Sequence, residues 1–156
     1  MTSVTIPSSV TSIGTNAFYG CSALSKTNYT GDIVGWGYIE FESYSANPMS
    51  YSHNFYINDQ EIKNLIIPES VTSNGEWTFY KCSSLTSVTI PNSVTNIEKD
   101  VFNGCSSLIT ITCEATTPPT LGSSNNLSSV TAVYVPAESV AAYKTADGWS
   151  YYADKI

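Results

Sequence analysis

One segment recurs along this chain of 156 residues and limits the fold more than any other feature. The segments Ser3–Leu24, Asn64–Leu85 and Ser87–Leu108 each carry an apolar pair and Pro, then Val, then Phe, Cys and Leu at matching offsets. The second segment is followed by the third after a single residue, whereas a much longer stretch separates the first from the second. Such self-similarity predicts a stack of similar turns rather than a fold around one central core.

The first apolar position of the repeat can be followed through the whole chain as the series Val4, Thr27, Leu65, Val88, Ile111 and Val133. The steps of this series are almost equal, except for the longer one from Thr27 to Leu65. Two positions further on stand Ile6, Tyr29, Ile67, Ile90, Cys113 and Val135. We predict about six parallel rungs of one sheet in a right-handed coil, with an insertion of about fifteen residues in the second rung. A period of roughly 20–29 residues with one strand per turn is typical of a leucine-rich-repeat solenoid, β-rich with short helical or 3₁₀ turns.

The residues of one turn explain why it must stack. Val88 and Ile90 alternate with polar neighbours, so one face of the strand is expected to be buried, and Pro91 ends the strand. Phe and Cys from a short helical or 3₁₀ turn fill the opposite wall, and the neighbouring turns cover the apolar sides. The predicted repeat core is Ile6, Phe18, Cys21, Leu24, Ile67, Phe79, Cys82, Leu85, Ile90, Phe102, Cys105 and Leu108.

We expect a single domain over residues 1–156 that ends in a cap. The predicted repeats lie near 3–26, 27–63 with the insertion, 64–86, 87–109 and 110–131, and the cap covers 132–156. Within the cap, Ala137–Ala146 is predicted to form a short helix that Asp147 and Gly148 end. Trp149 is expected to help close the open end of the core, together with Tyr152 and Ile156, because terminal repeats of solenoids need a cover.

The full pattern IPxSVTxIGxxAFxGCxxLxxVxIP resembles the BspA-type leucine-rich repeat of bacterial surface proteins, common in Bacteroidetes. Ile6–Leu24 matches it almost fully, while Asn74 stands where Ile is expected and Glu98 where Gly is expected. The insertion and the tail resemble segments of the same proteins. The resemblance implies a secreted or cell-surface location. Since the chain opens within a repeat and lacks a signal core, we expect a C-terminal fragment whose export signal lies upstream.

Composition and charge argue against several classes of partner. Only 12% of the residues are charged, with a formal net charge of −7 and six basic residues. Nucleic-acid binding needs clustered Lys and Arg, and adhesion to an anionic membrane needs the same, so neither is expected. No apolar run approaches the length of a membrane span.

The cysteines, the histidine and the paired glutamates, which are the residues that could support catalysis or metal binding, are all explained by structural roles or by strand geometry. Repeat register accounts for the four cysteines as small buried hydrophobes, although Cys82 and Cys105 could lie close enough for a disulfide with poor geometry. His53 is the only histidine and lies in the insertion, and Glu40 and Glu42 share one face of an expected strand. Same-face neighbours on a strand are always about 7 Å apart, so this spacing does not indicate a glycosidase. We expect no enzymatic activity, no metal site and no cofactor.

The candidate binding residues are exposed apolar side chains. The insertion carries eight aromatic residues, of which Trp36, Tyr38 and Tyr44 are the candidates for protein or carbohydrate contact. The alternative is a satellite core beneath a β-hairpin turning near Asn58. On the outward strand face, Ile66 and Tyr134 stand out in a row of small polar residues, the row being Thr5, Asn28, Ile66, Thr89, Thr112 and Tyr134.

Three functions remain open at this stage. The first is a non-catalytic cell-surface module for protein interaction or adhesion, with a host or bacterial surface protein as partner; the family resemblance implies it. The second is a structural spacer with no ligand of its own, and the third is carbohydrate binding at the aromatic insertion. We also expect that the uncapped N-terminal end, with Val4, Ile6 and Val10, can associate with another copy.

Overall fold

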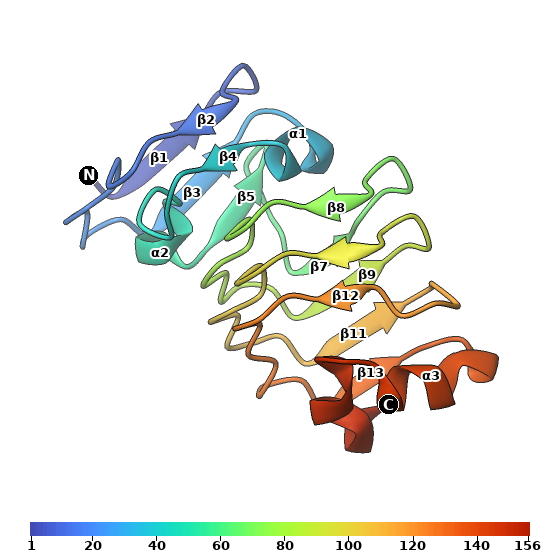
Figure 1. Ribbon diagram of the computed structural model, residues 1–156. Coiled ribbons are helices and arrows are strands. Elements are labelled where there is room, and N and C mark those ends of the chain that lie inside the picture. Colours follow the sequence, from blue (N-terminus) through green and yellow to red (C-terminus); the bar gives the residue numbers. More distant parts are fainter.

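The computed structural model describes residues 1–156 and has the architecture of a β-solenoid (Figure 1). Parallel strands follow one another along one side of the stack. The strands of this row are β1 (Ser3–Ile6), β3 (Lys26–Tyr29), β5 (Phe55–Ile57), β7 (Asn64–Ile66), β9 (Ser87–Ile90), β11 (Thr110–Cys113) and β13 (Ala132–Tyr134). The predicted β-rich solenoid with a row of parallel strands is therefore present.

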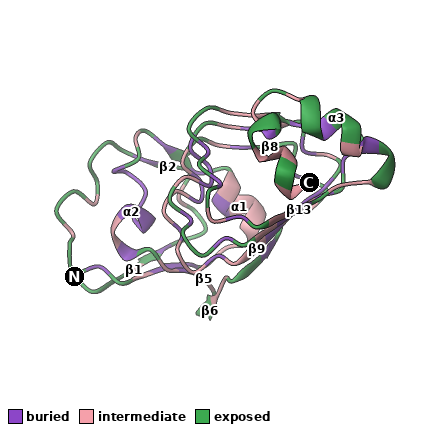
Figure 2. Ribbon diagram, turned by 90° about the horizontal axis from the view of Figure 1, so that it is seen from below, coloured by how far each residue is buried: buried purple, intermediate pink, exposed green.

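A second row of two-residue strands lies on the return side of each turn, and the core fills the space between the rows (Figures 1 and 2). These strands also pair in parallel: β2 pairs with β4, and β10 pairs with β8 on one side and with β12 on the other. Their bounds are β2 (Ser12–Ile13), β4 (Glu40–Phe41), β8 (Ser73–Asn74), β10 (Asn96–Ile97) and β12 (Thr120–Leu121). The core is one continuous cluster of 30 buried residues.

Side-chain hydroxyls tie neighbouring turns together. Thr86 Oγ1 donates to the carbonyl of Lys63 at 3.0 Å, and Ser93 Oγ donates to the carbonyl of Val71 at 2.8 Å. Further along, the Ser139 hydroxyl donates to the carbonyl of residue 116 at 2.7 Å. Each bond joins residues 22 or 23 positions apart, which is one repeat. The Ser- and Thr-rich composition therefore satisfies loop carbonyls that strand pairing leaves free.

The insertion contributes a strand that the apolar series does not include. Its helices are α1 (Ile33–Gly37) and α2 (Met49–Ser52), and β5 then enters the strand row beside β3. From β5 the chain reverses at Asn58 and Asp59, both with positive φ (49° and 64°), into β6 (Gln60–Glu61), which pairs antiparallel with β5. The hairpin near Asn58 is thus present. Because β7 pairs only with β9, the strand row forms two sheets instead of the predicted single one.

Ten of the twelve predicted core residues are buried. The exceptions are Phe18 and Cys21, which are half-buried. Both belong to the first turn, which packs against a neighbouring turn on one side only, whereas Phe79 and Phe102 stack on each other with centroids 5.9 Å apart. Burial in a solenoid depends on the next turn as much as on the residue itself.

The C-terminal segment closes the last turn with three short helices (Figure 1). They are η1 (Ala137–Ser139), α3 (Val140–Thr145) and η2 (Trp149–Lys155), with Gly148 at φ 77° before the last. Trp149 is fully buried and donates its indole N–H to the carbonyl of Pro119 at 2.8 Å. Tyr143 is fully buried as well, with its ring edge-on to Trp149 at 5.4 Å. The predicted cap with a short helix is present.

Candidate interaction surface

The outward face of the sheet β7–β9–β11–β13 carries one straight row of side chains. Parallel register places Ile66 beside Thr89, Thr89 beside Thr112, and Thr112 beside Tyr134. Ile66 and Tyr134 are the large members, exposed at 71% and 60%, while the two threonines are half-buried. Because neighbouring strands are about 4.8 Å apart, Ile66 and Tyr134 are separated by roughly 14 Å. We call this set of four residues the outward row.

The predicted continuation of this row onto the first sheet is wrong at Asn28. Register aligns Thr5, Asn28 and Tyr56, but Asn28 is 5% exposed. Its Oδ1 accepts the backbone N–H of Asp59 at 2.8 Å, so the hairpin tip covers it. Lys26 pairs with Asp59 at 2.6 Å and lies over the Tyr56 ring at 4.7 Å. The hairpin therefore limits the open face to the second sheet.

The structure corrects the prediction for Trp36, which is fully buried. Asp32 caps α1 by accepting the Gly35 N–H at 2.8 Å, and the short helix directs the indole into the core. There the indole N–H donates to the carbonyl of Thr78 at 2.9 Å, and the Phe55 ring lies at 4.6 Å. Trp36 is part of the main core and cannot contact a partner.

The other two candidates of the insertion are exposed. Tyr38 is 66% exposed and Tyr44 56% exposed. Tyr38 borders a pocket of about 400 Å³ between α1–β4 and β8, together with Trp77, while Tyr44 packs against Tyr80 with centroids 6.0 Å apart. The five candidates therefore divide into the outward row, the tyrosines of the insertion, and the buried Trp36.

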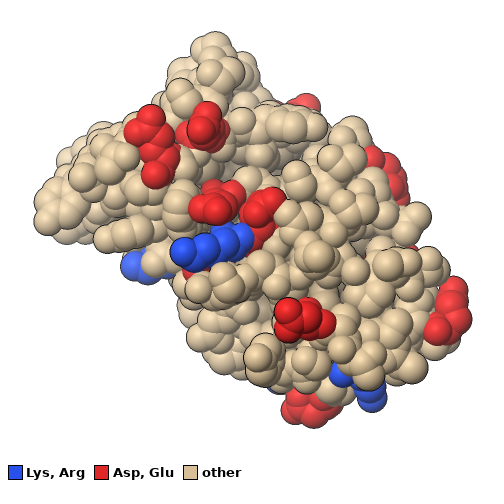
Figure 3. Space-filling view, in the orientation of Figure 1, with Lys and Arg blue, Asp and Glu red and all other residues tan.

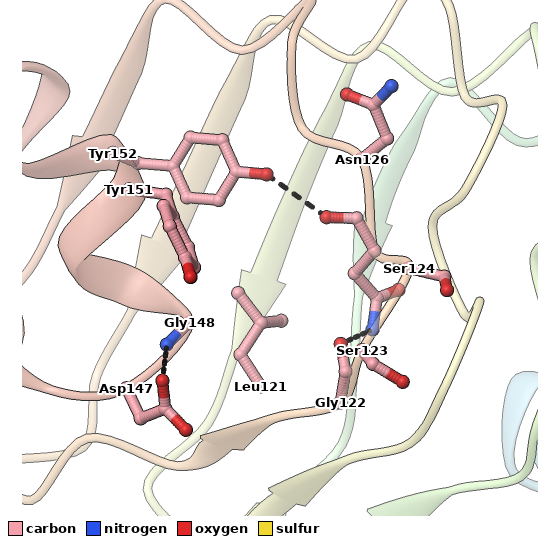
Figure 4. A pocket seen from close by; sticks show the side chains of 10 residues that line it. Leu121, Gly122, Ser123, Ser124, Asn126, Asp147, Gly148, Tyr151 and Tyr152 are labelled. Carbon is pink, nitrogen blue, oxygen red and sulfur yellow. Dashed lines mark hydrogen bonds between the residues drawn. The ribbon is translucent and has the colours of Figure 1, made fainter.

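A pocket of about 450 Å³ between the cap and the loop after β12 was missed from the sequence (Figure 4). Asp147 and Tyr151 border it on the cap side and Ser124 on the loop side, with Leu121 between the two walls. The Tyr152 hydroxyl bridges this cleft by donating to the carbonyl of residue 125 at 3.1 Å. The pocket lining is mostly polar, and its one carboxylate, Asp147, accepts from the N–H of Gly148 and makes no hydrogen bond to Ser123 or Ser124. No motif in the sequence signals a pocket assembled from two loops.

Three of the four thiols are buried and held neutral, those of Cys82, Cys105 and Cys113. Burial raises the pKa of Cys82 to about 11 and that of Cys113 to about 12, and it raises the pKa of Cys105 well above 9.0. The Cys105 thiol donates to the carbonyl of Phe79 at 3.1 Å. All four cysteines are free, so Cys82 and Cys105 form no disulfide. A thiol held neutral in this way is a poor nucleophile.

The remaining polar candidates have structural contacts. His53 ends α2 at φ 60°, and its carbonyl accepts the N–H of Ser83 at 2.8 Å. Glu42 accepts from the backbone N–H and the hydroxyl of Thr15 at 2.9 and 3.2 Å. No group of three or more His, Cys, Asp or Glu side chains is placed to hold a metal ion.

Charge on the face shown in Figure 3 is mostly acidic, with Asp and Glu in scattered groups and few Lys. Three ion pairs occur, and each joins a lysine to a carboxylate. None of the helices has both the length and the apolar character that crossing a membrane requires.

Short stacked strands, hydroxyl links between turns and one open sheet face define a leucine-rich-repeat solenoid. The chain belongs to the BspA-type leucine-rich-repeat family, whose model matches residues 1–60 and 49–137 with six copies. A leucine-rich cell surface protein from Faecalibacterium prausnitzii is 28% identical over 76% of this chain and 40% of its own length, with a TM-score of 0.43. The chain thus spans less than half of that protein. The comparison with curated proteins found no match.

Proposed function

We propose that this chain is a non-catalytic, cell-surface protein-interaction module whose outward row contacts a partner protein. The observation that carries the proposal is the exposure of Ile66 and Tyr134 at the two ends of one uncovered ladder. Exposed large apolar side chains on a flat, otherwise small polar face favour contact by shape, with apolar anchors at the ends. Membership of the BspA-type family supports a repeat surface as the binding element.

The spacer alternative is supported by a different observation. Thr89 and Thr112, in the middle of the outward row, have small half-buried side chains, and hydroxyl bonds link successive turns along the stack. A spacer needs only such repetitive links. Carbohydrate binding at the insertion loses support because Trp36, its largest aromatic side chain, is buried.

A binding assay on an array of extracellular proteins separates these functions. The purified chain is applied beside Ile66→Asp and Tyr134→Asp, with Tyr19→Asp as the matched control, since Tyr19 is 77% exposed and lies outside the outward row. We expect a protein that retains the chain and Tyr19→Asp but binds each row variant at least about tenfold more weakly. Binding that survives both row variants contradicts the proposed face, and an array without any binder supports the spacer.

A further inference from the structure

The stack of parallel strands is interrupted at one place, between β5 and β7. β5 pairs with β3 on one side and with β6 on the other, whereas β7 pairs with β9 alone. Only Ile62 and Lys63 connect β6 to β7, yet the two strands do not pair. In Figure 2, β6 projects from the strand row. β7 therefore has an open edge on the side of the hairpin.

Hydrogen-bond alternation identifies the free groups of this edge. Ile67 donates its N–H to the carbonyl of Thr89 on β9 at 3.0 Å. In a parallel ladder, alternate residues direct their main-chain groups to the same neighbour, so Leu65 faces β9 as well. The N–H and C=O groups of Asn64 and Ile66 face the hairpin instead, and no main-chain group there bonds to them.

An apolar pocket lies along this edge. Its volume is about 470 Å³, and it extends from the loop after β3 across the hairpin to β7. We call it the slot; its apolar lining is Ile33, Ile57, Ile62, Leu65 and Ile66. Ile66 belongs to both the slot and the outward row. A chain that pairs with β7 would place every second side chain against these isoleucines.

The charge beside the slot is negative. Lys26 is paired with Asp59 at 2.6 Å and Lys63 with Glu61 at 3.1 Å, so both nearby lysines are neutralised. Asp32, which lines the slot, is in no ion pair. A partner residue with positive charge is therefore favoured at this end.

We propose that an extended, basic segment of a partner protein adds to β7 as a further strand in the slot. Main-chain bonds to Asn64 and Ile66 would hold the segment, apolar side chains would fill the slot, and a Lys or Arg would face Asp32. The inference rests on the proposed function and names the partner's contacting segment. It places the segment beside the outward row, so that one partner can engage both.

Two features favour a foreign strand over the alternatives. Open edges are commonly blocked by Pro or by an inward charge, but β7 has the sequence Asn-Leu-Ile and carries neither. A second copy of this chain would bring another net charge of −7 to a slot that is itself acidic. A basic segment is attracted by the same charge.

Selection from a display library of random dodecapeptides provides the probe. We expect the enriched peptides to alternate apolar residues with a period of two and to contain Lys or Arg. The best-enriched synthetic peptide is then added to ¹⁵N-labelled protein, and amide hydrogen exchange is followed by NMR. The amides of Asn64 and Ile66 should change from fast to slow exchange, while the amide of Leu65, bonded toward β9, is protected from the start.

Changes in β7 and in the peptide test the main-chain hydrogen bonds that would join them. Ile66→Pro removes the N–H that faces the slot together with the Ile66 side chain and should weaken peptide binding at least about tenfold, whereas Ile66→Ala removes the side chain alone and should weaken binding less. Thr5→Pro is the matched control, because Thr5 also presents its N–H at an open parallel edge, on β1. Peptides N-methylated at the pairing amides should lose binding, and those methylated at the alternate amides should keep it. This comparison needs no change in the protein.

The outcomes separate strand addition from the proposed function. The inference is overturned if the enriched peptides do not alternate apolar residues, or if the peptide protects amides other than those of Asn64 and Ile66 from exchange. It is also overturned if the two series of N-methylated peptides bind equally well. Protection that grows with protein concentration in the absence of peptide indicates a second copy and overturns it as well. If an array protein depends on Tyr134 while no peptide enters the slot, only strand addition fails. If no array protein binds, the proposed function itself fails.

Discussion

At the scale of single residues, one repeat position can have opposite consequences in neighbouring turns. Asn74 stands at a position that Ile97 and Leu121 occupy in the paired strands. It is 2% exposed, and its Nδ2 has no hydrogen-bond partner. Asn125 is also buried, but its Nδ2 donates at 2.7 and 2.9 Å and its Oδ1 accepts at 2.9 Å. A buried amide stabilises the fold only when its bonds are formed.

Asn74→Leu should therefore stabilise the protein. Leu has nearly the shape of Asn and leaves no donor without a partner, so we expect the free energy of unfolding to rise by about 1–3 kcal/mol. Asn125→Leu is the matched control and should lower it by a similar amount, because it breaks three bonds. Urea unfolding measures both. A loss of stability in Asn74→Leu would show that Nδ2 is satisfied in solution.

Thiol reactivity should follow burial. Near neutral pH, Cys21, which is half-buried, should react with an aromatic disulfide reagent, and the other three thiols should react only after unfolding. Reaction of more than one thiol per native chain would contradict the buried placement.

The raised thiol pKa values also predict an alkaline loss of stability. The pKa of Cys82 is raised from 9.0 to about 11 in the folded chain. Its contribution to stability is present below pH 9 and lost as the pH rises toward 11, because the unfolded thiol ionises first. Urea unfolding at increasing pH should show this decline, and Cys82→Ala should reduce it. If stability falls as steeply with pH in the variant, groups other than Cys82 cause the decline.

At the scale of elements, the repeat period located the strands whose residues follow the pattern. It missed β5, because Phe55–Ile57 lies in the insertion and has no repeat neighbours in sequence. The long step from Thr27 to Leu65 revealed an insertion but could not show that its last part re-enters the strand row. The burial of Trp36 depends on the orientation of α1, and the slot depends on the failure of β6 to pair with β7. Neither leaves a periodic signal.

The cap provides a test at this scale. Trp149→Ala removes a fully buried indole and its bond to Pro119, so we expect a loss of about 3–5 kcal/mol in stability. Tyr151→Ala changes a residue of the same helix that is 81% exposed, and it should cost less than about 0.5 kcal/mol. Thermal unfolding of the two variants compares them directly. Equal effects would mean that the cap is not a closed part of the core.

At the scale of the whole molecule, stability and the proposed binding use different sides of the same strands. Inward residues form one continuous core of 30 residues, and hydroxyl bonds join successive turns. The outward side is left without a covering layer over the second sheet, while the hairpin covers part of the first. A repeat stack therefore presents a long flat face without any cost to its core.

The central claim is that a partner protein contacts the outward row. The most direct measurement is an NMR titration of the ¹⁵N-labelled chain with a protein retained on the extracellular array. The account predicts the largest amide shifts along Ile66, Thr89, Thr112 and Tyr134. Shifts confined to the cap pocket or to the first sheet, with the outward row unchanged, would contradict it.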